Sequence, residues 1–208
     1  GQPVEAFDGA GRCWRARVIA PDPRATTVEL LRLARHEPAP PPRPGLALAL
    51  AKPDAFEAAI EHAVELGAGV LLPLQAEHCV VRVDDKKATA KLARWQKIAR
   101  EALKQCERLH DMLVLEALPP AAAIAVAAAS LGLAPVALVE RDAAPPLLGV
   151  LASLPAPPLF LVGPEGGWSP AERALFDPIA RASLGPAILR AETAALAALA
   201  TTLAHAAT

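Results

Sequence analysis

Residues 158 to 194 read PLFLVGPEGGWSPAERALFDPIARASLGPAILRAETA and hold two glycine-bearing turns, each followed by a helix start signal. In the first, the apolar run 159–162 predicts a buried strand, and residues 163–167 follow it with little side-chain bulk. Ser169 is then a good N-cap, Pro170 suits the first helical position, and Glu172 completes a capping box. We therefore expect a helix that begins at residue 169 or 170, with its N-terminus toward the turn.

The second turn repeats this pattern. Leu184 and Gly185 end a short segment, Pro186 prevents simple continuation, and Thr193 or Glu192 is expected to cap an alanine-rich helix. Strand, glycine turn and helix, twice in succession, are expected where a small ligand binds at the carboxyl ends of strands in an α/β sheet. Two ordinary strand-to-helix connections are the alternative, because loops of about two to six residues are the norm there.

The preceding residues predict alternating strands and helices. We expect strands at 46–51, 69–74, 112–116 and 135–139, and helices at 53–67, 88–107 and 120–130. This order predicts parallel crossovers, and hence an α/β fold with a mainly parallel sheet. The apolar stretch 121–139 is interrupted by Ser130, Gly132 and Pro135, so a helix, a turn and a buried strand fit it better than a membrane span. The proline-rich connection 141–157 gives no clear signal.

The first residues predict a separate small β domain. Asp8-Gly9 stands between two short runs, which is a hairpin signal, and the second run alternates apolar residues with Arg15 and Arg17. These two arginines either contact RNA phosphates or lie on a solvated strand face. PAPPPRP at 38–44 should be extended and stiff, so we place a domain boundary there, between residues 1–44 and 45–208.

Charge is distributed unevenly along the chain. The formal net charge is −1, but residues 86–108 hold eight Lys or Arg against two Glu, a local charge of +6 that leaves −7 for the remainder. In the expected helix 88–107, Trp95 belongs to a core-facing apolar stripe, whereas Arg94, Lys97, Lys104 and Arg108 share another face, suited to a phosphate backbone or simply solvated.

Several chemistries are not supported by the sequence. No Lys-Ser/Thr follows GPEGG, no G-x-G-x-x-G follows a strand, and no Ser, His and Asp arrangement indicates a hydrolase. The histidines lack ligand spacing, and the three scattered cysteines indicate a reducing compartment and no metal site. With no signal peptide recognised, we expect a cytoplasmic protein that does not span a membrane.

The motifs GPEGGWSPAE at 163–172 and LGPAILRAETA at 184–194 resemble the two signature segments of the bacterial 16S ribosomal RNA uracil-N3 methyltransferase family. The resemblance continues through residues 46–78 and 94–108, about three quarters of the chain. It implies a C-terminal trefoil-knotted domain, which is a rare exception to unknotted topology, after a PUA-like β-barrel that is partial here because the chain starts without Met. It also implies S-adenosylmethionine as cofactor, N3 of a uridine in 16S ribosomal RNA as the methyl acceptor, and a homodimer formed through the C-terminal helix.

The resemblance also implies the site residues. The cofactor would be held by Leu138, Gly163, Pro164, Glu165, Gly166, Gly167, Leu184, Gly185, Ile188, Leu189, Arg190, Thr193 and Ala194. Arg190 is the candidate for stabilising deprotonated uracil or clamping its phosphate, with a salt bridge to Glu165 or Glu192 as the alternative, and Glu165 is either a base or a loop anchor. RNA would contact Arg15, Arg17, Lys52, Arg94, Lys97, Lys104, Gln105 and Arg108.

Three residues depart from the family pattern. His78 and His62 replace an Arg and a Lys, and Glu107 replaces a Gly. These changes erode the expected RNA face while the cofactor motifs stay intact. A non-enzymatic RNA-binding protein with the same fold, or a methyltransferase for a different RNA, are therefore the alternative functions.

Overall fold

The computed structural model describes residues 1–140 and 143–206. The chain forms two compact units, one of residues 1–41 and 103–111, and the other of residues 42–102 together with everything from 112 onward. The first unit is therefore discontinuous in sequence. In it, the amides of Gly11 and Asp111 donate to the carbonyls of Leu109 and Gly9, both at 2.9 Å.

The first unit contains the three-stranded antiparallel sheet β1-β2-β3, made of Pro3–Phe7, Arg12–Ala20 and Thr27–His36. The hairpin predicted at Asp8-Gly9 is confirmed, with Gly9 at φ +73°. The Asp8 carboxylate accepts the Ala10 amide at 2.8 Å and pairs with the Arg12 guanidinium at 2.7 Å. The Ala10 amide and Arg12 together lower the pKa of Asp8 to about 2.

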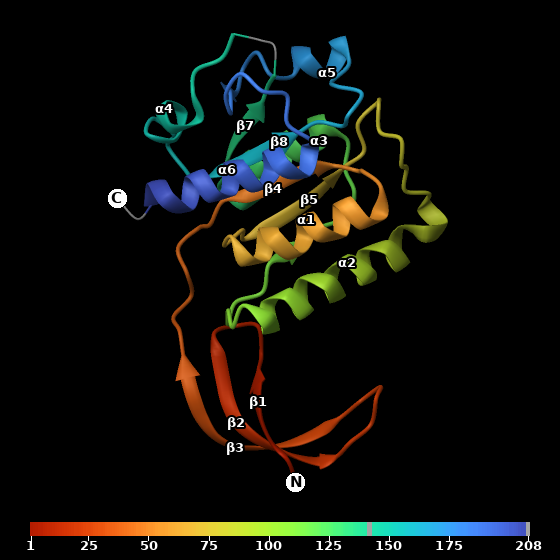
Figure 1. The fold of residues 1–208 in the computed structure, drawn as a ribbon, viewed down its shortest axis with the longest axis vertical. Helices are drawn as coiled ribbons and strands as arrows, with labels where there is room; N and C mark the ends of the chain where they lie inside the picture. Colours follow the sequence, from red (N-terminus) through yellow and green to blue (C-terminus); the bar gives the residue numbers. More distant parts are fainter. Residues whose placement is uncertain (141–142, 207–208) are drawn as a thin grey trace. The chain divides into compact units, whose positions relative to one another are not determined.

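The second unit is built on a six-stranded, fully parallel sheet in the order β6-β5-β4-β8-β7-β9 (Figure 1). In this order the strands are Leu113–Val114, Val70–Leu74, Gly45–Ala49, Pro158–Val162, Ala134–Leu138 and Ala180–Ala182. Every residue of β4, β5 and β8 is buried, as the continuous apolar runs predict for strands covered on both faces. The α/β class with a parallel sheet is confirmed.

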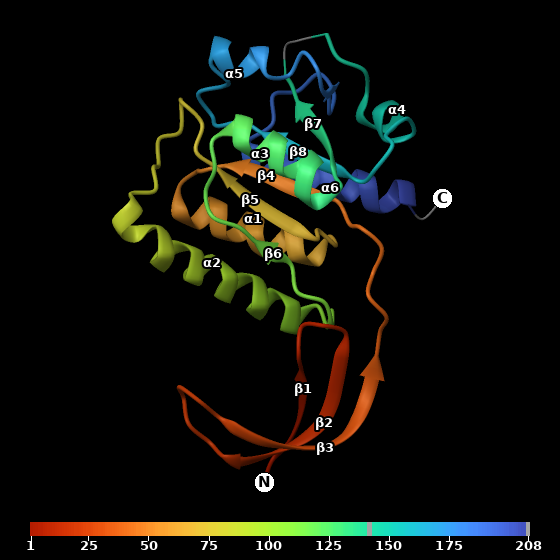
Figure 2. The same ribbon diagram turned by 180° about the vertical axis from the view of Figure 1, so that it is seen from behind.

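Helices cover both faces of this sheet. Helices α1 (Pro53–Glu65) and α6 (Ala191–Ala206) pack together on the face toward the viewer in Figure 1. Helix α3 (Pro120–Val126), which continues as the π-helical turn η1 (Ala127–Leu131), covers the opposite face (Figure 2). Gly132 ends η1 in the left-handed conformation and β7 follows. The helix, turn and strand predicted for 121–139 are confirmed, and no helix of the described residues is long and apolar enough to cross a membrane.

Helix α2 spans Asp85–Gln105 and begins three residues earlier than predicted. Trp95 is 6% exposed, and its ring centroid lies 5.1 Å from that of Phe56 on α1. Trp95 is therefore a core residue, as the spacing of the apolar stripe predicts. The opposite, polar side of the helix lies in solvent.

Helix α6 begins at Ala191, and the Ala194 amide donates to the Arg190 carbonyl at 2.8 Å. Glu192 and Thr193 therefore lie inside its first turn, and the prediction that one of them caps the helix is wrong. The first residue of the helix, Ala191, is buried. The helix buries one stripe, consisting of Ala191, Ala195, Ala198 and Leu199.

Candidate functional site

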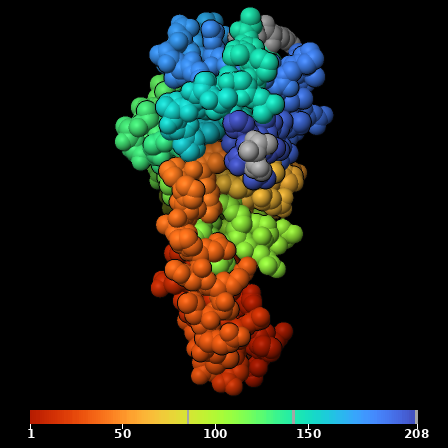
Figure 3. Space-filling view, turned by 90° about the vertical axis from the view of Figure 1, so that its left-hand side faces the viewer, coloured from red at the N-terminus to blue at the C-terminus, as the bar shows by residue number. Residues whose placement is uncertain are grey.

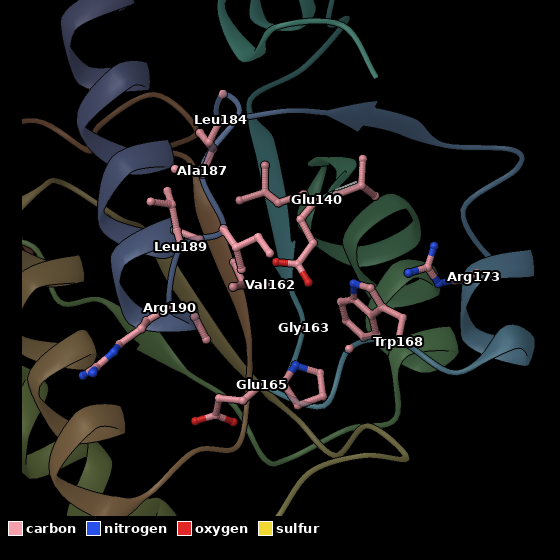
Figure 4. Close-up of a pocket in the computed structure, with 18 of the residues that line it drawn as sticks. Glu140, Val162, Gly163, Glu165, Trp168, Arg173, Leu184, Ala187, Leu189 and Arg190 are labelled. Atoms are coloured by element: carbon pink, nitrogen blue, oxygen red, sulfur yellow. The ribbon is translucent and has the colours of Figure 1, made fainter. Parts of the chain in front are cut away.

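Three chain segments meet beyond the carboxyl ends of the adjacent strands β8, β7 and β9 and enclose a pocket of about 300 Å³ (Figure 4). Carboxyl ends of parallel strands are where ligands bind in open α/β sheets, and pockets for small molecules start at about this volume. The lining residues are Leu138, Val139, Glu140, Val162, Gly163, Pro164, Glu165, Gly167, Trp168, Arg173, Phe176, Leu184, Gly185, Ala187, Ile188, Leu189, Arg190, Ala191 and Ala194.

The first turn is shaped by an indole ring. A Cβ at Gly163 would lie 2.8 Å from Cε2 of Trp168, so only glycine lets the ring pack against the backbone at the end of β8. Trp168 is 9% exposed and meets Phe176 edge to face at 5.0 Å. The Gly167 amide donates to the Pro164 carbonyl at 2.8 Å and closes the turn. Gly167 has φ +73°, and a Cβ there would meet no atom within 4 Å.

The turn leads into α5 (Pro170–Ala174), where the predicted capping box is confirmed. The Ser169 hydroxyl accepts the Glu172 amide at 3.3 Å, and Glu172 Oε2 accepts the Ser169 amide at 2.9 Å. Glu172 is only 8% exposed, and its Oε1 accepts the Glu77 amide at 2.8 Å. One buried carboxylate thus anchors both α5 and the chain that follows β5, a contact that sequence reasoning missed.

The second turn is held by Ser183. Its hydroxyl accepts the Gly185 amide at 3.2 Å, and its backbone amide donates to the Pro145 carbonyl at 2.9 Å. Gly185 has φ +119°, a conformation that favours glycine. The chain then passes the pocket at residues 187–190 and enters α6 directly.

Four charged residues line the pocket. In Figure 4 the Glu140 carboxylate points into the pocket, Arg173 lies on the Trp168 side, and Arg190 extends away from the centre on the other side. Arg190 and Glu165 are exposed, and the ion pairs found among the described residues do not include Arg190. The salt-bridge alternative for Arg190 therefore finds no support in this structure.

Eleven of the thirteen cofactor residues predicted from the sequence line the pocket. The described residues that line it do not include Gly166, which faces His78, or Thr193, which is exposed on α6. Glu140 also lines the pocket, at the strand end that the sequence places at the carboxyl edge of the sheet, although it was not among the predicted cofactor residues. Arg173 and Phe176 had no local signal, because α5 brings them to the pocket only after folding.

The predicted RNA-binding residues are mostly exposed, but several are paired within the protein. Arg15 pairs with Glu5 at 3.0 Å, and Arg17 pairs with Glu29 at 2.6 Å. Two of the predicted RNA-binding residues lie in the part of α2 that belongs to the second unit. Arg94 donates to Glu57 at 2.8 Å, which lowers the pKa of Glu57, whereas Lys97 is exposed. Of the remaining predictions, Lys52, Lys104 and Gln105 are exposed and Arg108 is half-buried.

Comparison with known proteins identifies the fold. A family model described as an RNA methyltransferase domain matches residues 39–203. The chain belongs to this family. The resemblance found in the two turn motifs is confirmed.

Individual relatives agree. The chain is 35% identical over 215 residues to a ribosomal RNA small subunit methyltransferase E from Synechocystis. The aligned region covers 96% of this chain but 65% of that relative's length. Among solved structures, it superimposes on a ribosomal RNA small subunit methyltransferase E from Neisseria gonorrhoeae bound to S-adenosyl methionine, with TM-score 0.80, 27% identity, and 98% and 83% of the two chains covered. A putative methyltransferase from Legionella pneumophila with bound SAM gives TM-score 0.83, 25% identity, and 98% and 83% coverage.

Proposed function

We propose that this protein is an S-adenosylmethionine-dependent methyltransferase that methylates N3 of a uridine in 16S ribosomal RNA, and that it acts in the cytoplasm, where ribosomes are assembled. The observation that carries the proposal is the convergence of both glycine turns on one pocket, in a chain of the RNA methyltransferase family. The relatives named for activity on small-subunit ribosomal RNA, and the neighbours solved with this cofactor, support the choice of substrate and methyl donor.

The pocket residues fit this cofactor. Leu138, Val162, Leu184 and Leu189 provide apolar walls for an adenine ring, and the glycine turn leaves open space at Gly167 for close approach to the backbone. When bound, S-adenosylmethionine supplies a methyl group on a positively charged sulfur. The chain's own contribution is to hold that donor and the acceptor base in line, and positioning alone contributes about 7 to 11 kcal/mol at its upper range.

Arg190 and Glu165 are the residues we propose for the chemistry at the acceptor. Both line the pocket and are exposed, so an RNA base or phosphate has direct access to them. A guanidinium beside the base stabilises the anion left when N3 loses its proton, or holds the adjacent phosphate. Glu165 serves either as the proton acceptor or as an anchor of the turn.

We assign residues 1–44 to a PUA-like domain with its linker, and residues 45–208 to a knotted methyltransferase domain. The antiparallel sheet β1-β2-β3 supports the first assignment. The second is supported by the course of the chain after β9. Most of residues 184–191 line the pocket together with most of residues 162–168, and α6 then packs on β4 and β8.

Methyl transfer itself is the direct test. Purified protein incubated with S-adenosylmethionine and small ribosomal subunits from cells that lack the protein should produce 3-methyluridine in 16S ribosomal RNA, detected by nucleoside mass spectrometry. Glu165→Gln and Arg190→Ala should each slow the reaction about 100-fold or more if they act as proposed. Methylation of another base or RNA would replace the proposed substrate, and no methylation of any RNA despite RNA binding would favour a non-enzymatic binding protein.

Cofactor binding can be separated from backbone strain by two matched glycine variants. Gly167 and Gly132 both have positive φ (+73° and +62°) and open space around a Cβ, but only Gly167 lines the pocket. Gly167→Val and Gly132→Val should each lose about 1 to 2 kcal/mol of stability. Calorimetry should show S-adenosylmethionine binding to the wild type and Gly132→Val, and none to Gly167→Val. Equal affinities in both variants would remove the turn from the binding site.

The exposed Lys97 on α2 is our test of the RNA surface. Lys97→Glu should weaken binding of 16S ribosomal RNA fragments and reduce the slope of log affinity against log salt by about 1 to 2, while the affinity for S-adenosylmethionine stays unchanged. The matched comparison is the double variant Arg94→Gln with Glu57→Gln, which removes an ion pair on the same helix face without changing the net charge, so the salt slope should stay as in the wild type. A salt slope that does not change for Lys97→Glu would assign this face to solvent only.

We further propose a homodimer that includes α6. Beyond its buried stripe, the helix presents Leu203, 53% exposed, and exposed alanines, and Leu148 on the adjoining helix α4 (Leu147–Leu151) is 56% exposed. Figure 3 shows the end of α6 and the α4 segment side by side on the surface. Small and apolar residues permit close approach of two identical faces around a two-fold axis.

Sedimentation at micromolar concentration should give twice the sequence mass for the wild type. Leu203→Glu should shift it to the monomer, because it places a charge in the interface, whereas Val80→Glu, at a position that is 81% exposed and outside α6, should leave the dimer intact. Ala198 is unsuitable for this test, since it is fully buried within the chain. A wild-type monomer would contradict the proposal.

A further inference from the structure

The loop after β5 lies against the back of the first glycine turn. Residues 75–84 connect β5 to α2 and are braced internally: the Val83 amide donates to Gln75 Oε1 at 2.9 Å, and Arg82 Nη2 donates to the Glu77 carbonyl at 2.8 Å. The start of this loop is also fixed to α5, because the buried Glu172 accepts the Glu77 amide. These hydrogen bonds restrain the conformation of the loop that carries His78.

The exposed His78 ring contacts the turn and is not among the residues that line the pocket. Its Nδ1 lies 3.0 Å from the Gly167 carbonyl oxygen and 3.2 Å from that of Gly166. Carbonyl oxygens only accept hydrogen bonds, so Nδ1 carries the proton and donates to both. A Cβ on Gly166 would lie 2.9 Å from His78 Cβ, which explains why residue 166 is glycine although it does not line the pocket.

The two carbonyl groups are constrained differently. The Gly166 carbonyl shares a planar peptide with the Gly167 amide, so the bond from that amide to the Pro164 carbonyl already restrains it. The hydrogen bond found for the Gly167 carbonyl among the described residues is the one from His78. Because glycine has the largest backbone freedom, that hydrogen bond opposes rotation of the 167–168 peptide, which would change the backbone that lines the pocket at Gly167.

We propose that His78 is a positioning residue for the methyl-donor pocket: its Nδ1–H holds the carbonyls of Gly166 and Gly167 outward and keeps the glycine turn in its binding-competent form. This inference rests on the proposed function for its consequence, but the positioning itself is a property of the free protein. Pre-organising the turn raises affinity because the ordering cost is not incurred at binding. His78 stands where the family pattern has an arginine, a change that removes positive charge from the expected RNA face. The proposal gives this histidine a separate role in shaping the cofactor pocket.

Three variants separate hydrogen-bond donation from packing. His78→Asn keeps a hydrogen-bond donor near the position of Nδ1. His78→Asp matches Asn in size, but its carboxylate presents only acceptors to the two carbonyls, and His78→Ala removes both the donor and the side-chain bulk. Hydrogen exchange measured by mass spectrometry without cofactor should show faster exchange across residues 163–169 in the Asp and Ala variants than in the wild type and Asn variant. Melting temperatures identify any variant that is globally unfolded.

The second readout is the affinity for S-adenosylmethionine. We expect it to fall roughly tenfold for His78→Asp and His78→Ala, the loss of about one net hydrogen bond, and to stay within about twofold of wild type for His78→Asn. Equal exchange of the turn in the Asn and Asp variants would overturn the inference, whatever the affinities. A different outcome is slow exchange of the turn in the variants that keep the donor, together with no binding of S-adenosylmethionine to the wild type. That outcome would support His78 as a positioning residue and refute the proposed function.

Discussion

The position of β8 in the middle of the parallel sheet is the constraint on which the site depends. It pairs with β4 on one side and β7 on the other, and Leu159, Phe160 and Leu161 are fully buried. Its carboxyl end cannot shift without breaking pairing on both sides. The chain therefore turns at Gly163 against the Trp168 ring. The positions of the pocket, the capping box and the His78 contact depend on where this turn begins.

Features encoded locally could be predicted from the sequence. The buried strands, the hairpin at Asp8-Gly9, the capping box of Ser169 and Glu172 and the core position of Trp95 each follow from a few neighbouring residues. Eleven of the pocket-lining residues were implied as well, because both glycine turns resemble the signature segments of a known family.

Features set by long-range packing could not be predicted. The Glu77 amide meets Glu172 across 95 residues of sequence, and no periodicity or motif signals that pairing. Residues 103–111 begin with the last three residues of α2, most of which belongs to the second unit, yet they group with the first unit. The start of α6 was misplaced because Glu192 and Thr193 are residues that suit a cap, although the helix already begins at Ala191.

The pocket combines apolar walls with two solvent-exposed charges, Arg190 and Glu165. Exposed charges such as Arg190 and Glu165 interact weakly with their surroundings while water screens them. In the proposed reaction, an RNA that covers them excludes this water and strengthens both charges at the moment when the base becomes an anion. The substrate therefore completes the electrostatic environment that its own chemistry requires.

The discontinuity of the first unit has a consequence for biosynthesis. Its sheet is made from the first 36 residues, but the backbone bonds from Gly9 and Gly11 reach residues 109–111. On a ribosome that adds about 5 to 20 residues per second, the hairpin emerges several seconds before its partner segment does. During that interval β4, α1, β5 and α2 are synthesised, so the first unit cannot finish folding until these elements have been translated. Its sheet precedes the second unit in sequence, yet the segment that completes it is translated only after them.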